Sequence, residues 1–168
     1  LHGDANFALP WEIEEGLVTP LGYLAAVAFF QQKNDQPGST NALASLSEER
    51  RVSRELNGLV AEAMPVFKTL PIDAAKEKVL QQMIHYPTYR LQFERQILGQ
   101  HPPTVLEAKL SHDLTYYRYF DRIAALAEQA ADLKTLIADL KRLPADATLG
   151  STEKYLSELS SRYMAAAS

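Results

Sequence analysis

The chain has 168 residues, of which 46% are hydrophobic and 23% are charged, and this composition is typical of one globular domain. Asp and Glu (21) outnumber Lys and Arg (17), and the resulting net charge of −4 argues against a nucleic-acid partner. Cysteine is absent, which excludes disulfides, thiolate metal centres and cysteine nucleophiles. We therefore expect a single domain over residues 1–168 that uses no thiol chemistry.

The N-terminal part of the chain gives few structural signals. Its first residue is Leu1 rather than Met, which predicts that the chain is a processed or excised piece of a longer protein. Residues 1–18 are expected to be irregular, with one helical turn closed by Gly16. The apolar run 21–30 covers about ten residues where a bilayer span needs about 20, so it predicts a buried helix rather than a membrane span.

Proline, glycine and capping residues divide the following sequence into helices. Thr19 and Pro20 have the pattern of an N-cap followed by a first-turn proline, and Ser45 with Glu48 forms a capping box. The segment 34–41 (NDQPGSTN) consists of turn-forming residues and predicts a loop. These signals place helices at 20–33, 45–63, 72–86, 88–99 and 151–167.

Three further prolines set the limits of these helices. Pro65 is expected to break or kink the helix that starts at Ser45. Pro71 has the position of a first helical residue, and Pro87 either kinks the next helix or splits it in two. Ser151 is expected to cap the last helix.

A long segment free of helix breakers follows. No proline or glycine occurs between Thr104, which opens a second capping box, and Pro144. The sequence therefore predicts one long helix over about 104–143, roughly 60 Å in length. Apolar and aromatic residues recur along it at alternating spacings of four and three, from His112 to Leu140, so it needs partner helices. Since no segment has the alternation of a strand, the predicted fold is all-α, an antiparallel bundle of four to five helices built on this long helix.

The turn at 99–103 is short, so the helices before and after it are expected to lie antiparallel. Matching their heights puts three pairs opposite one another: Phe93 and Leu110, Glu94 and Lys109, Arg90 and Asp113. Apolar side chains meet apolar ones and positive charges meet negative ones in these pairs, which favours the hairpin.

The same hairpin brings polar aromatic, histidine and arginine side chains to one level, beside the space that a kink at Pro87 opens. Tyrosine hydroxyls and guanidinium groups are suited to binding a small anion such as a carboxylate. The candidate ligand-binding residues are His85, Tyr86, Tyr89, Arg90, His112, Tyr116 and Tyr119. The alternative is that the tyrosines fill a wide part of the core, with Arg90 paired to Asp113.

The sequence lacks the motifs of common metal and catalytic sites. It has no Glu-x-x-His pair, no HExxH and no His-x3-His pairing, so no metal or other cofactor is expected. It also has no G-x-S-x-G motif and no glycine-rich phosphate loop, which favours a protein that is not an enzyme.

These features favour a non-enzymatic helical binding domain. The start at Leu1, a chain end that stops in helix-forming residues and the candidate site together favour the extracytoplasmic sensing domain of a bacterial receptor, located in the periplasm, which transmits a signal when a small ligand binds. The alternative is an adaptor or scaffold that binds a protein partner through an exposed apolar strip formed by Leu106, Leu110, Leu114, Tyr117, Ala124, Ala127 and Ala131. Either function is compatible with a homodimer.

Overall fold

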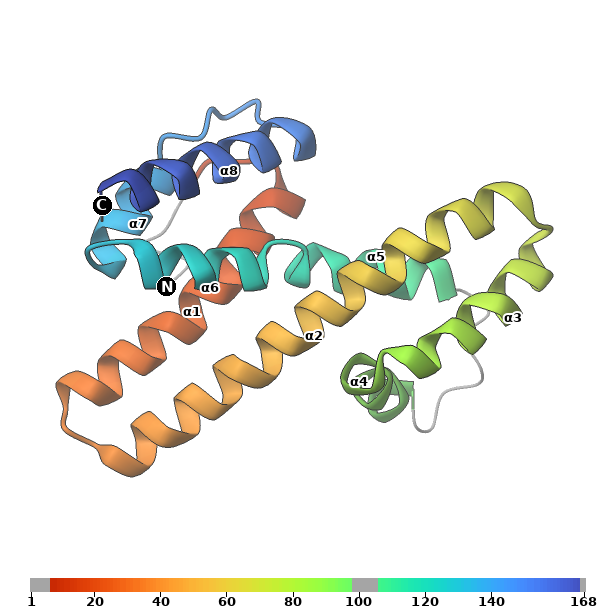
Figure 1. Cartoon of the computed structure of the whole chain (residues 1–168), viewed down its shortest axis with the longest axis horizontal. Helices are drawn as coiled ribbons and strands as arrows, with labels where there is room; N and C mark the ends of the chain where they lie inside the picture. Colours follow the sequence, from red (N-terminus) through yellow and green to blue (C-terminus); the bar gives the residue numbers. More distant parts are fainter. Residues whose placement is uncertain (1–6, 98–105, 167–168) are drawn as a thin grey trace.

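The computed structural model of the chain describes residues 7–97 and 106–166, and every regular element in these two stretches is helical. In chain order the elements are α1 (Trp11–Gln32), α2 (Gln36–Thr69), α3 (Ile72–Gln82), the 3-10 turn η1 (Met83–His85), α4 (Pro87–Ile97), α5 (Leu106–Tyr117), α6 (Phe120–Gln129), α7 (Leu133–Leu140) and α8 (Leu149–Ala166). These helices pack together as an all-α bundle, which confirms the predicted fold class (Figure 1).

Helix α1 begins earlier than the sequence predicts, at Trp11, so residues 11–18 are helical rather than irregular. Pro20 lies inside the helix, where it cannot donate a hydrogen bond to the preceding turn. Tertiary packing offsets this loss, because Leu17 and Leu21 are fully buried on either side of it. Proline at this position is therefore an interior residue and not the start of a helix.

The apolar run 21–30 is the second half of this 22-residue helix, not a short helix of its own. By length and composition alone, α1 is one helix in the described part of the chain that is long and apolar enough to cross a bilayer. The core helix of a soluble protein meets the same criteria, and 39% of the apolar stretch of α1 is buried inside the fold.

The loop expected at 34–41 is much shorter in the structure, since α2 begins at Gln36. Asp35 is the N-cap of α2, and its carboxylate accepts the backbone N–H of Gly38 at 3.0 Å. Asn34 adopts the left-handed conformation, with φ of 55°, that asparagine tolerates better than most residues. Of the segment 34–41, therefore, only residues 34 and 35 belong to the connection, and residues 36–41 are the start of α2.

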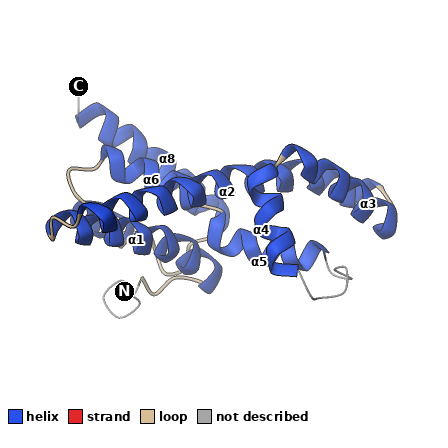
Figure 2. Ribbon diagram, turned by 90° about the horizontal axis from the view of Figure 1, so that it is seen from below, coloured by secondary structure: helices blue, strands red, loops and turns tan. Residues whose placement is uncertain are grey.

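Helix α2 is the longest element, with 34 residues and a length of about 50 Å. It passes through Ser45 and Pro65 without a break, so neither the predicted start at 45 nor the predicted end near 63 is correct. It packs against α1, α3, α4, α5 and α6, and this long helix rather than the 104–143 segment organises the bundle (Figures 1 and 2).

The long helix predicted at 104–143 is three helices in the structure, α5, α6 and α7. Side chains of α2 account for the first break. Ser53 Oγ donates to the Tyr117 carbonyl at 2.6 Å and accepts the Asp121 N–H at 3.2 Å, while Asn57 Nδ2 donates to the Tyr117 carbonyl at 3.2 Å. These bonds replace those that a continuous helix would make within itself. The second break has a local cause, because Asp132 caps α7 through the N–H of Thr135 at 2.7 Å.

Two predictions from local signals are confirmed. The chain is split at Pro87, the first residue of α4, whose N-terminus is capped by Glu55 of α2. Helix α8 occupies the segment predicted for the last helix, but it begins at Leu149, and Thr148 rather than Ser151 caps it by accepting the Ser151 N–H at 3.2 Å. The predicted antiparallel arrangement of the helices before and after 99–103 is wrong, because α4 crosses α5. In Figure 1, α4 is seen nearly end-on, whereas α5 runs across the view. The turn itself and Thr104 lie outside the described residues.

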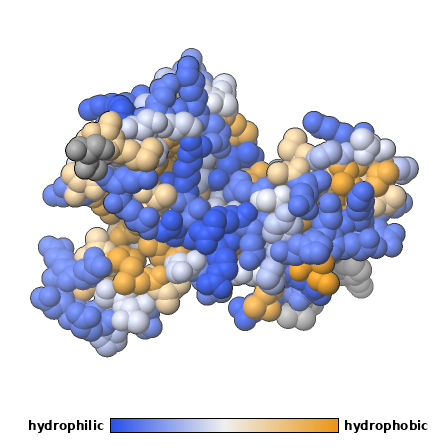
Figure 3. Space-filling view, viewed as in Figure 1, coloured by the Kyte–Doolittle hydropathy of each residue, from blue (hydrophilic) through white to orange (hydrophobic). Residues whose placement is uncertain are grey.

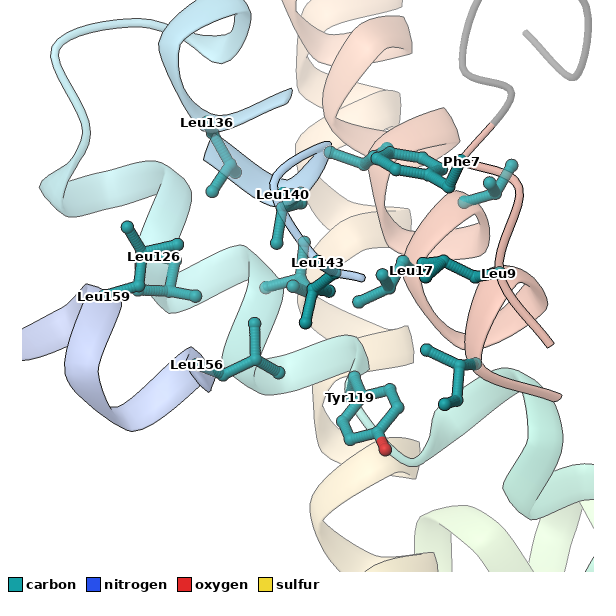
Figure 4. Close-up of a cluster of buried hydrophobic side chains, with 14 of the residues drawn as sticks. Phe7, Leu9, Leu17, Tyr119, Leu126, Leu136, Leu140, Leu143, Leu156 and Leu159 are labelled. Carbon is teal, nitrogen blue, oxygen red and sulfur yellow. The ribbon is translucent and has the colours of Figure 1, made fainter. Parts of the chain in front are cut away.

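The core is divided into two clusters of buried side chains. The first, here called the α8 cluster, joins the first half of α1 to α6, α7 and α8 through residues such as Leu17, Ile123 and Leu156 (Figure 4). The second, the α3 cluster, joins α2 to α3, α4 and α5 through residues such as Leu59 and Phe93. Most of the apolar strip that was expected to bind a partner lies in the core instead, since Leu106, Leu110, Leu114 and Ala124 are buried.

Candidate ligand site

A hollow of about 550 Å³ lies between α1, α4 and α5, and it is open to solvent. Its lining is contributed by Thr19 of α1, Gln92 and Gln96 of α4, and Lys109, His112, Asp113, Tyr116 and Tyr117 of α5. The spacing of the α5 residues places them on one face of that helix, because side chains three and four positions apart are neighbours. The hollow therefore combines amide, ammonium, imidazole, carboxylate and phenol groups in one place.

The carboxylate of Asp113 lies deepest in this group, and only 4% of the residue is exposed. It accepts a hydrogen bond from the Tyr89 hydroxyl at 2.8 Å and is paired with the ammonium group of Lys109, one turn earlier in α5. His112 Nδ1 lies 3.3 Å from its Oδ1. A buried carboxylate needs several such partners to offset its loss of hydration, so these three side chains keep Asp113 in place.

Tyr89 supplies its hydroxyl from the core side, on α4, and is itself fully buried. Burial raises the pKa of its hydroxyl far above the ordinary value, and the nearby Asp113 carboxylate raises it further. The hydroxyl is therefore protonated at neutral pH and acts as a donor to Asp113.

Tyr117 connects the hollow to the long helix α2. Its hydroxyl donates to Glu49 Oε2 at 2.6 Å and accepts a hydrogen bond from Gln92 Nε2 at 2.9 Å. Glu49 also accepts the hydroxyl of Tyr23 at 3.3 Å, on α1. One hydrogen-bond network therefore joins α1, α2, α4 and α5 and includes Gln92 in the wall of the hollow.

Aromatic rings form the rim of the hollow on the α1 side. The ring of Tyr116 lies 5.3 Å from that of His112 and meets the Trp11 ring edge-on at 6.5 Å. His112 and Trp11 are both exposed, so this row of rings is accessible from solvent. Such a row offers flat apolar contact next to the polar floor.

Together these groups suit a small ligand that carries a negative charge beside a planar or apolar part. An ammonium group has three protons to donate, so Lys109 can bind an anion while it remains paired with Asp113. The imidazole of His112 and the amide groups of Gln92 and Gln96 add further donors, and the ring of Tyr116 provides the apolar contact.

Of the seven residues singled out in the sequence, the structure brings three to this hollow. Tyr89 lies under its floor, and His112 and Tyr116 line its wall. Tyr119 belongs to the α8 cluster instead, where its ring packs against Gly16 of α1. It is separated from Tyr116 by the break between α5 and α6.

The other three lie elsewhere because α4 crosses α5 instead of running alongside it. His85 is exposed in η1, and the ring of Tyr86 packs over Gly58 of α2, where an added Cβ would come within 2.9 Å of the ring. Arg90 is exposed and pairs with Glu94 in its own helix at 2.6 Å, not with Asp113.

Sequence reasoning missed Thr19, Gln92, Gln96 and Lys109 as members of one group. Lys109 and Asp113 are spaced i, i+4 on one helix, and this spacing was a usable signal for their ion pair. The two glutamines gave no signal, because an uncharged polar residue on a helix face is usual at any solvent-exposed position.

The described residues contain no group of three or more His, Asp or Glu side chains that could hold a metal ion. Comparison of the chain with protein-family models, with curated proteins and with solved structures finds no match.

Proposed function

We propose that this protein is a non-enzymatic ligand-binding domain, and that the hollow between α1, α4 and α5 binds a small organic carboxylate. One observation carries the proposal: Lys109 and His112 line an open hollow of about 550 Å³ while both contact the buried carboxylate of Asp113. The volume lies within the range of about 300–1,000 Å³ that is typical of small-molecule sites.

Asp113 supports binding rather than catalysis in this proposal. Its oxygens already accept from Tyr89, Lys109 and His112, so no basic lone pair is directed at a ligand. A general base must reach the proton that it removes, and Asp113 is occupied from inside the protein. Its role is to fix the direction of the Lys109 ammonium group and the His112 ring.

The position of the hollow supports a sensing function. A ligand that contacts Gln92 and Lys109 bridges α4 and α5, which have few close backbone contacts within residues 7–97 and 106–166, so it is expected to favour one arrangement of α4 relative to α5. We propose that this is the signal of an extracytoplasmic receptor domain in a bacterial periplasm. The Tyr117 network offers the path to α1 and α2.

The test is a thermal-shift screen with small aliphatic and aromatic carboxylates, with amines and nitrate as comparison compounds. A carboxylate present at about 100 times its dissociation constant stabilises the folded state by about 2.7 kcal/mol, which raises the melting temperature by several degrees. Carboxylates are expected to raise the midpoint, and amines of the same size are not.

Matched variants locate the site. His112→Ala and Tyr116→Ala are expected to reduce the shift. His85→Ala, which alters a histidine outside the hollow, and Arg90→Ala, which removes a cation of α4 outside the hollow, leave it unchanged. The proposal is wrong if no carboxylate shifts the midpoint, or if the shift is the same in all four variants.

A further inference from the structure

The second half of α1 and the first part of α2 form a helical hairpin, residues 22–47, that projects from the bundle and is here called the arm. In Figure 1 it extends to the lower left, and Figure 3 shows it separated by a notch from the part of the molecule that holds α7 and α8. Its turn is at 33–35, and Phe30 packs over Gly38 next to this turn.

The arm is almost free of charge. Between residues 22 and 47 the only charged side chains are Lys33 and Asp35, both in the turn at its tip. Helix α8 provides the contrast, because its solvent side carries Glu153, Lys154, Glu158 and Arg162. A surface helix ordinarily has such a charged face opposite its apolar stripe, and the two helices of the arm have none.

Large apolar side chains are exposed on the arm. Phe29 is 53% exposed and Leu43 is 46% exposed, and small residues such as Ala28 and Ala44 lie exposed beside them. Orange side chains gather on the arm where it borders the notch in Figure 3. A four-helix bundle consists of two helix pairs that bury apolar side chains between them, and the arm corresponds to one such pair.

A second feature lies where the arm joins the bundle. A hollow of about 380 Å³ is lined there by Leu43, Leu46, Ser47, Arg50, Arg54 and Glu128. Arg50 and Arg54 both bind the same oxygen of Asp121 at 2.7 Å, and the side chain of Arg54 is 55% exposed. Arg50 also pairs with Glu128, whereas the exposed guanidinium group of Arg54 keeps N–H donors besides the one that binds Asp121.

We propose that the arm is a self-association surface, on which the arm of a second copy packs antiparallel to complete a four-helix bundle. Leu43 lies at the centre of this arrangement. Asp35 at the tip and Arg51 at the base are equally far from Leu43 along α2, so an antiparallel pair that crosses at Leu43 brings Asp35 of one copy level with Arg51 of the other. The tip of each arm thereby reaches the hollow at the base of the other.

Charge complementarity favours this occupant. The carboxylate of Asp35 comes level with Arg51, which is exposed, and near the exposed guanidinium group of Arg54, which binds Asp121 through one of its nitrogens. A two-fold axis makes each of these contacts twice. An anionic lipid surface is a poorer occupant, because a single lysine provides little attraction to it.

The interface is small and its expected affinity is correspondingly modest. The arm presents a face about 20 Å long and about 20 Å wide, or about 400 Å² per copy, which is half of the roughly 800 Å² per partner of a standard interface. We therefore expect a reversible dimer that forms with rising concentration, and this association is independent of the proposed ligand hollow.

The experiment is sedimentation velocity of the whole chain over a concentration series from about 5 to about 500 μM. The weight-average sedimentation coefficient is expected to rise toward that of a dimer. Leu43→Glu and Phe29→Glu are expected to weaken association at least about tenfold. Leu91→Glu alters a leucine on α4 that is equally exposed, and it leaves the association unchanged.

A charge exchange separates a dimer contact from a folding defect. Asp35→Arg and Arg54→Asp each place like charges together in a homodimer, whereas a mixture of the two variants pairs them with opposite charge. The mixture is expected to associate more strongly than either variant alone, with far-UV circular dichroism as the check on folding. Loss of the Asp35 helix cap cannot produce this recovery.

Three outcomes overturn the proposal. The first is a monomer at every concentration, and the second is association that Leu43→Glu does not weaken. The third is a protein that remains monomeric but floats with vesicles of phosphatidylcholine and phosphatidylglycerol and loses this property in Phe29→Glu, which assigns the arm to a lipid surface.

Discussion

The protein contains two tyrosine–aspartate pairs with a buried carboxylate, one in each half of the bundle. Tyr89 donates to Asp113 at 2.8 Å between α4 and α5, and Tyr163 donates to Asp139 at 2.8 Å between α8 and α7. The bonds are alike, but their surroundings differ. Asp113 borders a hollow together with an ammonium and an imidazole group, whereas Asp139 is held by Arg142 at 3.1 Å, and its backbone carbonyl accepts the Tyr155 hydroxyl at 2.5 Å.

The comparison shows that two tyrosine–aspartate hydrogen bonds of the same length can have very different surroundings. Tyr163 and Asp139 attach the last helix to α7, and this is a structural role that many packed helices need. What distinguishes Asp113 is that its other partners line an open hollow, so that the buried carboxylate orients groups that a ligand can reach.

The largest expected difference between the pairs concerns the aspartates. Asp113→Ala leaves the Tyr89 hydroxyl buried without an acceptor and Lys109 without its carboxylate, at a cost of about 3 kcal/mol in the free energy of unfolding. Asp139→Ala should cost only about 1 kcal/mol, because Tyr163 is partly exposed and Arg142 faces solvent. Urea denaturation followed by circular dichroism measures both, and equal losses would contradict the comparison.

Alkaline pH gives the next effect in size. Burial raises the pKa of Tyr119 to about 12, with a smaller contribution from Glu153, and burial also raises the pKa of Tyr89 and Tyr163. A tyrosine whose pKa is higher in the folded state stabilises the fold fully below the unfolded value of about 10, and this stabilisation is lost as the pH rises. For Tyr119 alone the loss between about pH 10 and about pH 12 is roughly 2–3 kcal/mol.

Urea midpoints measured across this pH range, with tyrosinate absorbance as a second signal, test this dependence. Tyr119→Phe is expected to make the fall in stability with pH less steep. Tyr155→Phe serves as the comparison, because it removes a hydroxyl that donates to the Asp139 carbonyl at 2.5 Å and is expected to lower stability at every pH. A stability that stays constant while all tyrosines ionise together would contradict the burial of these hydroxyls.

The success of sequence reasoning depended on where the controlling residues lie. The split at Pro87 and the last helix rest on local signals and were predicted correctly. The break before α6 was not predictable from the 104–143 segment, because the groups that replace its helical hydrogen bonds, Ser53 and Asn57, come from α2. The break before α7 is local, since Asp132 and Thr135 form an N-cap that the heptad pattern concealed.

The candidate site was only partly predictable for a similar reason. Tyr89, His112 and Tyr116 were grouped by assuming that the flanking helices lie antiparallel, and they do gather at the hollow. The same assumption placed Arg90 opposite Asp113, whereas the crossing of α4 and α5 directs it to Glu94. Crossing angles depend on how side chains of two helices interlock, and no periodicity in one helix determines them.

The smallest expected effect isolates the two hydroxyl groups themselves. Tyr89→Phe removes a donor to a carboxylate that is almost fully buried, so we expect a loss of about 1.5–2 kcal/mol in the free energy of unfolding. Tyr163→Phe should cost about 0.5–1 kcal/mol, since Asp139 keeps Arg142 and solvent as alternative partners.

The two substitutions should also differ in ligand response, which stability alone does not reveal. Tyr89→Phe removes the hydrogen bond that fixes the Asp113 carboxylate from the core side. Asp113 then positions Lys109 and His112 less firmly, and carboxylate binding is expected to weaken severalfold. Tyr163→Phe leaves the hollow untouched and therefore leaves binding unchanged. The comparison is contradicted if both variants bind carboxylates as the unmodified protein does. In that case the Tyr89–Asp113 pair only joins two helices, as the Tyr163–Asp139 pair does, and the orientation of Lys109 and His112 does not depend on it.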